Sequence, residues 1–391
     1  MSWPLIKLGD VCERVSVGHV GATSEFYTDE SGVPFLRTQN VSSEGIVFED
    51  VKYITHEFHR ALKKSTLSAD DVVMSRVVST SLNCGIVPES LEGANCANII
   101  LARPLRDKLD SKYLIHYLRS SDVQGRLLAR QVGSAQSVVN TSVLKSWEIP
   151  LPPLPEQKRI AAILDKADAI RRKRQQAIQL ADDFLRAVFL DMFGDPVSNP
   201  KGWEMLPFST VGTLDRGKSR HRPRNDPALL GGAHPLIQTG EVANSRGYIK
   251  EYSATYSDLG LAQSKKWDAG TLCITIAANI AKTGILTFPA CFPDSVVGFI
   301  PNKHVTVEYV QHWLGFLQKN LEENAPQAAQ KNINLEILRG LLIPVPPKSK
   351  QEKFSSIAAG ILAAEGKIAS SGNALGNAFD ALSQKAFSGK L

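Results

Sequence analysis

Two long stretches of the chain carry apolar residues alternately three and four positions apart, which is the spacing of the buried seam of a coiled coil. They cover residues 149–193 and 343–387, and they align without a gap at an offset of 194 residues. The seam positions predicted in the first stretch are Ile160, Ile163, Ala167, Ile170, Arg174, Ala177, Ala181, Phe184 and Val188. Those predicted in the second are Phe354, Ile357, Ile361, Ala364, Ile368, Ser371, Leu375, Ala378 and Leu382. Each stretch therefore predicts a long helix whose apolar seam needs a partner.

The two predicted helices are the natural partners of each other. Pro155 and Pro347 mark their starts, because proline is tolerated in the first turn of a helix but not in its interior. The second helix contains several glycines, each costing roughly 1 kcal/mol relative to alanine, so it depends on packing against another element. Since each helix follows its own globular half, we expect a pseudo-twofold arrangement with antiparallel helices, in which Arg174 lies near Ile368.

The repeat extends into the segments before each helix. The matching segments are 3–11 and 203–211, 34–41 and 235–242, 72–78 and 272–278, 112–118 and 308–314, and 140–150 and 334–344. Their order is the same in both halves, so a duplication of a whole domain explains them. The predicted parts are two globular domains at 1–154 and 197–346 and two spacer helices at 155–196 and 347–391.

Each globular half predicts a mixture of strands and helices. The predicted strands lie around 34–38, 51–54, 71–77 and 97–102, matched by 235–239, 248–252, 271–277 and 296–300. An amphipathic helix follows at 111–130 or 306–321, then a short helix capped by Asn140 or Asn334. We therefore expect an α+β fold in each half, a mixture of helices and strands with a curved sheet.

Length and composition agree with this division. A chain of 391 residues exceeds what one core usually organises, and 43% of it is hydrophobic. We find no apolar run of about 18 residues and no signal-peptide pattern, so we expect neither a membrane span nor secretion. The five cysteines form no Cys-x-x-Cys pair, which favours reduced thiols in a cytoplasm.

Motifs of catalysis are missing from the sequence. There is no phosphate loop, dinucleotide fingerprint, His-Glu-x-x-His or Gly-x-Ser-x-Gly motif, so we expect a non-catalytic chain. His56 and His59 form the nearest approach to a metal-ligand pair, but no cysteine or carboxylate cluster lies beside them. We therefore expect a surface helix there and no metal.

The net charge of +6 is mild, and its local distribution is more informative. Residues 215–226 form a basic loop in which Arg, Lys, Ser and His are the types that reach phosphates and purine edges. Its candidate DNA contacts are Lys218, Ser219, Arg220, His221, Arg222 and Arg224. The alternative is a solvated loop.

A polar cluster also follows a predicted strand in each half. The candidates for reading bases are Arg37, Thr38, Gln39 and Asn40 in the first half and Gln238, Thr239 and Glu241 in the second. Arginine can bind guanine, Gln and Asn can bind adenine, and Glu can accept from cytosine. The same residues could instead cap turns.

Two further pairs of loops are candidates for phosphate contact. One pair contributes Arg76, Ser79, Ser81, Lys282 and Thr283, and the other Ser134, Gln136, Gln330 and Lys331. Ser, Thr, Gln and Lys near a helix N-terminus suit an anion, although simple capping explains them nearly as well. The run from Arg171 to Arg174 lies mid-helix, where a solvated face competes with contact to DNA or an acidic partner.

Two divergent halves, each followed by a helix of the type IPLPPLPEQKRIA, resemble the specificity (S) subunit of type I restriction-modification enzymes. The segment FLDMFGDPVSNPKGWE after the first helix and the ending QKAFSGKL are also similar to that family. The resemblance covers essentially the whole chain. One departure is that the first half has VGSAQSVVN where the second has APQAAQKNIN.

The resemblance implies a cytoplasmic protein of defence against foreign DNA, without a cofactor of its own. Each half would be a target recognition domain that reads one half of an asymmetric, interrupted DNA site, and the helices would set the spacing. Two methyltransferase (M) subunits would act on adenine with S-adenosylmethionine, and two restriction (R) motor-nuclease subunits would use ATP and magnesium. The rival hypothesis is a coiled-coil scaffold for protein partners without DNA readout. An S subunit that serves a methyltransferase alone also remains open.

Overall fold

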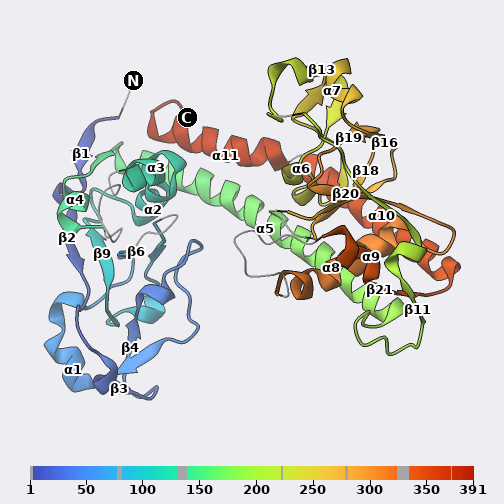
Figure 1. Cartoon of the computed structure of the whole chain (residues 1–391). Coiled ribbons are helices and arrows are strands. Elements are labelled where there is room, and N and C mark those ends of the chain that lie inside the picture. The colour runs from blue at the N-terminus through green and yellow to red at the C-terminus, as the bar shows by residue number, and fades with distance from the viewer. Residues whose placement is uncertain are drawn as a thin grey trace. The chain divides into compact units, whose positions relative to one another are not determined.

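The computed structural model divides into two compact units, drawn in Figure 1. Unit 1 comprises residues 1–175 and 369–391, and unit 2 comprises residues 176–368. The structure describes residues 3–76, 82–129, 139–221, 223–277, 281–323, 334–370 and 372–391, without the side chains of 128, 319–323, 365–370 and 372–378. Each unit thus combines one globular part with part of each long helical stretch.

Unit 1 contains two four-stranded sheets and one two-stranded sheet. The strand orders are β2-β9-β6-β7, β3-β5-β4-β8 and β1-β10. The strands are β1 (Leu5–Lys7), β2 (Cys12–Val17), β3 (Tyr27–Thr28), β4 (Val33–Leu36), β5 (Lys52–Ile54), β6 (Val72–Ser75), β7 (Cys84–Ile86), β8 (Asn95–Cys96), β9 (Ile99–Pro104) and β10 (Glu148–Pro150). Every residue of β6 is buried, including Ser75, as expected for a central strand.

Unit 2 repeats this design with one more strand. Its orders are β12-β20-β17-β18-β14, β15-β13-β19-β16 and β11-β21. The strands are β11 (Glu204–Pro207), β12 (Gly212–Arg216), β13 (Leu230–Leu236), β14 (Gly247–Ile249), β15 (Ala254–Tyr256), β16 (Lys266–Trp267), β17 (Leu272–Thr275), β18 (Thr283–Leu286), β19 (Ala290–Cys291), β20 (Val296–Pro301) and β21 (Leu342–Val345). Both units therefore mix helices with largely antiparallel sheets, as expected.

One predicted strand match between the halves is wrong. The strand at 51–54 was expected to correspond to 248–252, but β5 pairs Pro34 with Tyr53, and the same register in unit 2 pairs Pro235 with Thr255 of β15. Strand β14 instead pairs in parallel with β18 of the other sheet. Loop insertions shift the offset here, so a similar run of apolar residues was matched in place of the true equivalent.

The remaining helices follow the pattern with one difference. They are α1 (His56–Ala61), α2 (Ser111–Arg119), α3 (Ser121–Ala129), α4 (Thr141–Lys145), α6 (Thr239–Ala243), α7 (Asp258–Ala262), α8 (Val307–Glu323) and α9 (Leu335–Gly340). The helix expected at 111–130 is two helices, because Ser120 has an extended backbone and its hydroxyl bonds to the Tyr117 carbonyl. Asn140 caps α4 and Asn334 caps α9 through side-chain oxygens, as expected.

Helix α5 (Leu154–Phe193) spans both units, while α10 (Lys348–Ser370) and α11 (Gly372–Phe387) form the second helical stretch. In unit 1, Arg159 donates to the Leu391 carbonyl and Arg171 lies over the Phe379 ring. A later residue of α5 thus contacts an earlier residue of the C-terminal stretch, so α5 and α11 run antiparallel in this unit. The expected proximity of Arg174 and Ile368 involves a side chain outside the described set.

The predicted seam of α5 is buried or partly buried except at two positions. Ile170 and Phe184 were expected to be buried but are 53% and 55% exposed. The most buried positions toward the two ends of α5 are Ile160, Ala161, Leu164, Leu185, Phe189 and Phe193. The first three share a core with residues of α2 in unit 1, and the last three share a core with residues of α8 in unit 2. Each end of α5 therefore packs against the globular part of its unit as well as against the second helical stretch.

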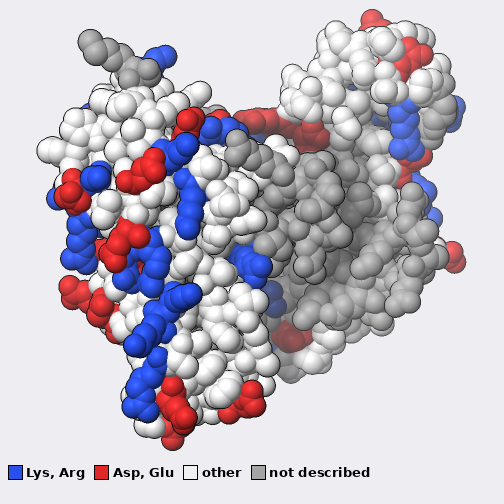
Figure 2. Space-filling view, turned by 90° about the vertical axis from the view of Figure 1, so that its left-hand side faces the viewer, with Lys and Arg blue, Asp and Glu red and all other residues white. Residues whose placement is uncertain are grey.

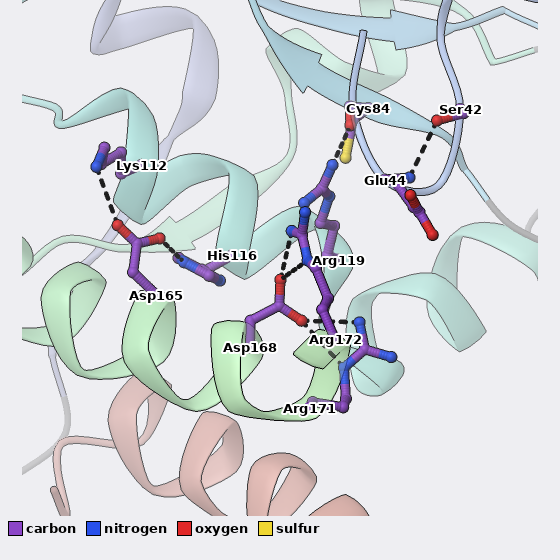
Figure 3. Close-up of polar contacts among 10 residues, drawn as sticks. All are labelled: Ser42, Glu44, Cys84, Lys112, His116, Arg119, Asp165, Asp168, Arg171 and Arg172. Carbon is purple, nitrogen blue, oxygen red and sulfur yellow. Dashed lines mark hydrogen bonds and ion pairs between the residues drawn. The ribbon is translucent and has the colours of Figure 1, made fainter. Parts of the chain in front are cut away.

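A polar contact fixes α2 against α5 in unit 1 (Figure 3). The carboxylate of Asp165 accepts from Lys112 at 3.0 Å and from His116 Nε2 at 2.8 Å. Burial lowers the pKa of His116 despite this neighbour, so the ring is neutral at pH 7. Asp165 has its pKa lowered, because hydrogen bonds from His116 and Lys112 outweigh the opposing effect of burial.

Other features limit the chemistry of the described chain. All five cysteines are free and buried. Among the described residues there is no group of three or more His, Cys, Asp or Glu that could hold a metal ion. Within the same residues no helix is long and apolar enough to cross a membrane.

Candidate nucleic-acid interface

The polar cluster of unit 1 lies in the turn after β4. A short 3-10 helix, η3 (Thr38–Asn40), begins there, and the Asn40 Oδ1 accepts from the Arg37 backbone N–H at 2.9 Å. Asn40 is fully buried, and its Nδ2 donates to the carbonyls of Val47 and Glu49. Asn40 therefore fixes the turn against the segment before β5, while its neighbours face outward.

Asp50 gathers the outward-facing side chains of this turn. Its Oδ2 accepts from Arg37 Nη2 at 2.8 Å and from Gln39 Nε2 at 3.0 Å, and its Oδ1 accepts from Lys52 Nζ at 2.5 Å. Arg37 also donates to the Asp50 carbonyl at 2.7 Å. These contacts lower the pKa of Asp50 to about 2, so the carboxylate is charged at neutral pH. Thr38 donates separately, to the Asn98 carbonyl.

Unit 2 builds the equivalent turn around the carboxylate of Glu241 and has no basic side chain at the positions of Arg37 and Lys52. Glu241 in the first turn of α6 accepts from the Gln238 backbone N–H at 3.1 Å and from the Ser253 hydroxyl. These hydrogen bonds lower the pKa of Glu241. Tyr252, next to Ser253, is 48% exposed and lies edge-on to Phe288. Gln238 is exposed at the start of α6, and Thr239 is partly buried.

The strand register shows which residues of the two turns correspond. Lys52 pairs with Phe35 in unit 1, and Ala254 pairs with Leu236 in unit 2. Counting back from these pairs places Tyr252 at the position of Asp50. The two units thus share a backbone design but present different side chains at the same place.

The basic loop of unit 2 follows β12 and is fixed at both ends. The backbone of Gly217 packs so closely against that of Phe292 that an added Cβ would lie 2.2 Å from the Phe292 carbonyl oxygen. The Gln263 Oε1 accepts from the backbone N–H groups of Arg220 and His221, and Ser264 donates to the Lys218 carbonyl. This loop is therefore held in a defined shape.

Two side chains of this loop, Arg224 and His221, lie beside aspartates. Arg224 Nη2 lies 2.5 Å from Asp294 Oδ1, and His221 Nε2 lies 2.9 Å from Asp226 Oδ2. Lys218 and Arg220 are exposed and Ser219 is buried. Arg222 lies outside the described residues. On the face drawn in Figure 2, acidic side chains likewise lie among the basic ones.

The other candidate loops are described only in part. Ser79, Ser81, Ser134, Gln136, Gln330 and Lys331 lie outside the described residues. The Arg76 carbonyl accepts from the Val139 N–H at 2.9 Å, and Thr283 opens β18. Lys282 Nζ lies 3.4 Å from Gln318 Oε1. DNA contact by these loops stays a prediction.

Two arginines of the mid-helix run are paired within α5 (Figure 3). Asp168 accepts from Arg171 at 2.7 Å and also from Arg172. The Asp168 side chain is 10% exposed, and these hydrogen bonds lower its pKa. The geometry favours a salt-bridged helix face at this point over a free cationic patch.

Sequence reasoning missed Asp50, Ser253 and Tyr252. The signal available in the sequence was the pair of acidic residues, Glu49 and Asp50, at the end of the segment that leads into β5, the antiparallel partner of β4. Reading it required the strand register, because residue 50 lies thirteen positions after Arg37 in sequence.

The chain matches the family described as the type I restriction modification DNA specificity domain over residues 2–180 and 200–359. It is 24% identical over 374 residues to a Methanocaldococcus jannaschii protein named for the MjaX specificity subunit of a type I restriction enzyme, covering 90% of this chain and 85% of that protein. It is 20% identical over 359 residues to the EcoKI specificity subunit of Escherichia coli K12, covering 84% of this chain and 75% of that one.

Solved structures share the fold. The S subunit of a type I restriction-modification system from M. genitalium gives a TM-score of 0.61 at 15% identity, covering 99% of this chain and 96% of that chain. A chain from a study of complex assembly in a type I R-M system gives 0.50 at 20% identity, covering 100% and 98%. The predicted fold class, two mixed α and β domains with a long helix between them, is confirmed.

Proposed function

The chain belongs to the family of type I restriction modification DNA specificity domains and provides DNA sequence specificity, and we propose that its two units read the two halves of an asymmetric, interrupted site. The role shown by the family is recognition rather than catalysis. This membership replaces the rival hypothesis of a scaffold without DNA readout.

The observation that carries the proposal is the chemical difference at register-equivalent positions. Unit 1 presents Arg37 where unit 2 presents Gln238, and Lys52 where unit 2 has Ala254. Arginine suits the O6 and N7 acceptors of guanine, whereas glutamine suits the N6 and N7 groups of adenine. Two domains of one fold with different contact residues would read different bases, so the site would not be a palindrome.

Other subunits complete the proposed enzyme. We infer two methyltransferase (M) subunits that modify adenine with S-adenosylmethionine, and two restriction (R) subunits that use ATP and magnesium. A solved chain of similar fold comes from a study of complex assembly in a type I R-M system, which supports partner subunits in general. The proposed location is the cytoplasm, where such an enzyme meets its DNA.

Paired substitutions in the two units test the proposal. The chain is expressed with its methyltransferase, and methylation is measured on duplexes in which one half-site at a time is altered. Arg37→Ala is expected to relax discrimination at one half-site, and Gln238→Ala at the other, each contact being worth about 1–3 kcal/mol. Equal loss at both half-sites for each variant would contradict separate readers.

A further inference from the structure

Two of the arginines proposed to meet DNA, Arg37 in unit 1 and Arg224 in unit 2, are already bound to carboxylates of their own unit. In unit 1 the carboxylate of Asp50 holds Arg37, Gln39 and Lys52 at distances between 2.5 and 3.0 Å. Over the three charged groups one positive charge remains. A DNA phosphate that approaches Arg37 must therefore displace an internal anion rather than find a free cation.

The backbone around Asp50 is built for this contact. Asp50 has a φ of 51°, a left-handed conformation that asparagine and aspartate tolerate better than other side chains. This conformation lets the Asp50 carbonyl and carboxylate both accept from Arg37 Nη2. The buried Asn40 holds the segment just before Asp50 by donating to the carbonyls of Val47 and Glu49, so the position of the Asp50 carboxylate beside Arg37 is fixed.

Asp50 and Arg37 occur together in unit 1 and are replaced together in unit 2. At the register-equivalent positions unit 2 has Tyr252, Gln238 and Ala254 in place of Asp50, Arg37 and Lys52. In the basic loop of unit 2, Asp294 pairs with Arg224 at 2.5 Å. An aspartate beside an arginine therefore occurs in both units, although at different places on the shared backbone.

We propose that Asp50 is a specificity-determining counter-ion that holds Arg37 until a base edge with two well-placed acceptors replaces it. The inference rests on the proposed function and adds a residue to it. A phosphate that takes Arg37 leaves the Asp50 carboxylate beside another anion without its partner, whereas at a G·C pair the guanine edge accepts from Arg37 and the amino group of the paired cytosine donates to Asp50. Asp50 would therefore weaken binding to arbitrary DNA more than binding to the correct half-site.

The test uses Asp50→Asn in the full chain with its methyltransferase. Asparagine keeps the size and the left-handed backbone but removes the charge. Kd is measured by fluorescence anisotropy over a range of salt on three duplexes: the methylated motif, the motif with the first half-site scrambled, and the motif with the second scrambled. The methylation assay described above identifies the half-sites of the motif. The half-site at which Arg37→Ala relaxes discrimination is the one that unit 1 reads.

A matched control removes the same charge elsewhere. Asp70 also has a positive φ, 71°, and pairs with the exposed Arg106 at 3.4 Å outside the proposed interface. Asp70→Asn is expected to change every Kd less than about twofold, since an exposed pair contributes little. Asp294→Asn should act only on discrimination at the half-site read by unit 2.

The expected result for Asp50→Asn is binding about threefold tighter on DNA scrambled at the unit 1 half-site, with little change on the full motif. On that scrambled DNA, the Kd of Asp50→Asn should depend more steeply on salt concentration than the wild-type Kd does, by about one phosphate contact. If Asp50→Asn and Asp70→Asn behave alike while the wild-type protein still discriminates, the counter-ion role is wrong and the reading proposal stands. If the wild-type protein does not discriminate between the duplexes, the proposed function itself fails.

Discussion

At the scale of single residues, one buried glutamine in each unit joins the globular part to the long helix that follows it in the chain. Gln157 Oε1 accepts from the Asp110 N–H, and its Nε2 donates to the carbonyls of Lys108 and Pro152. Gln351 does the same in unit 2, with Thr306, His304 and Pro346. Both side chains are fully buried, so their hydrogen bonds cannot be replaced by water.

Gln157→Ala is expected to lower the free energy of unfolding of unit 1 by about 2 kcal/mol, because it leaves the Asp110 N–H and the carbonyls of Lys108 and Pro152 without the buried amide as their partner. Urea unfolding followed by tryptophan fluorescence measures the change. Gln179→Ala is the control, since Gln179 is exposed and donates to the exposed Asp183, and it should stay within about 0.5 kcal/mol. Similar losses for both variants would contradict the role of the buried amide.

The residue scale is also where the sequence was least informative. Arg37, Gln39 and Gln238 could be chosen as candidates because their side chains suit base edges. The capping roles of Asn40 and Glu241 could be named only as an alternative, because a polar residue after a strand looks the same whether it faces inward or outward. The partner of Arg37 depends on which strands pair, and no local pattern gives that.

At the scale of elements, burial decides the helix faces. Phe354 at the start of the second stretch lies 5.5 Å from the Phe189 ring and 5.6 Å from the Phe193 ring. The heptad pattern predicted Phe354 as a seam residue and the structure buries it fully, whereas Phe184 on α5 is mainly exposed. The period could be predicted from sequence, but the side on which each domain covers the helix could not.

Phe354→Ala is expected to cost about 4 kcal/mol of the unfolding free energy of unit 2, by loss of buried surface and formation of a cavity. Phe184→Ala serves as the comparison and should cost less than about 1 kcal/mol. Urea unfolding of both variants compares a predicted seam residue that is buried with one that is exposed. A larger loss for Phe184→Ala would contradict this difference in burial.

The contact between α2 and α5 predicts a pH dependence of stability. Folding lowers the pKa of His116, so near pH 6 the unfolded chain binds more protons than the folded one. The free energy of unfolding should therefore rise with pH across the ordinary histidine pKa of about 6.5 and level off above it. Burial also lowers the pKa of His312 on α8, which adds to the same rise.

His116→Gln should reduce the rise in stability between about pH 5 and pH 7.5, because the titrating group of unit 1 is removed while His312 remains. Thermal unfolding at several pH values measures this slope. A slope unchanged by the substitution would mean that His116 takes up its proton equally well in the folded and unfolded chain.

At the scale of the whole molecule, repetition was the most reliable guide. The repeat at an offset near 194 predicted two domains of one fold, and both units contain the same three sheets with one added strand in unit 2. The mismatch of β15 arose because loops changed length after duplication. Differences in the loops, rather than in the sheets, are what the proposed asymmetric site requires.

The long helices are expected to set the distance between the half-sites. Inserting four residues into α5 and four into the second stretch adds about 6 Å to each at about 1.5 Å per residue. The methylated motif should then keep both half-sequences and change only its gap. Altered half-sequences with an unchanged gap would contradict the spacing role.

The central claim is that two unlike domains of this chain read one interrupted DNA site. The most direct measurement expresses the chain with its methyltransferase in a host without DNA methylation and maps modified adenines across the genome at single-base resolution. The account predicts methylation on both strands of one asymmetric motif split by a fixed gap of unspecified bases. A continuous palindromic motif, or an active methyltransferase that marks no motif, would contradict it.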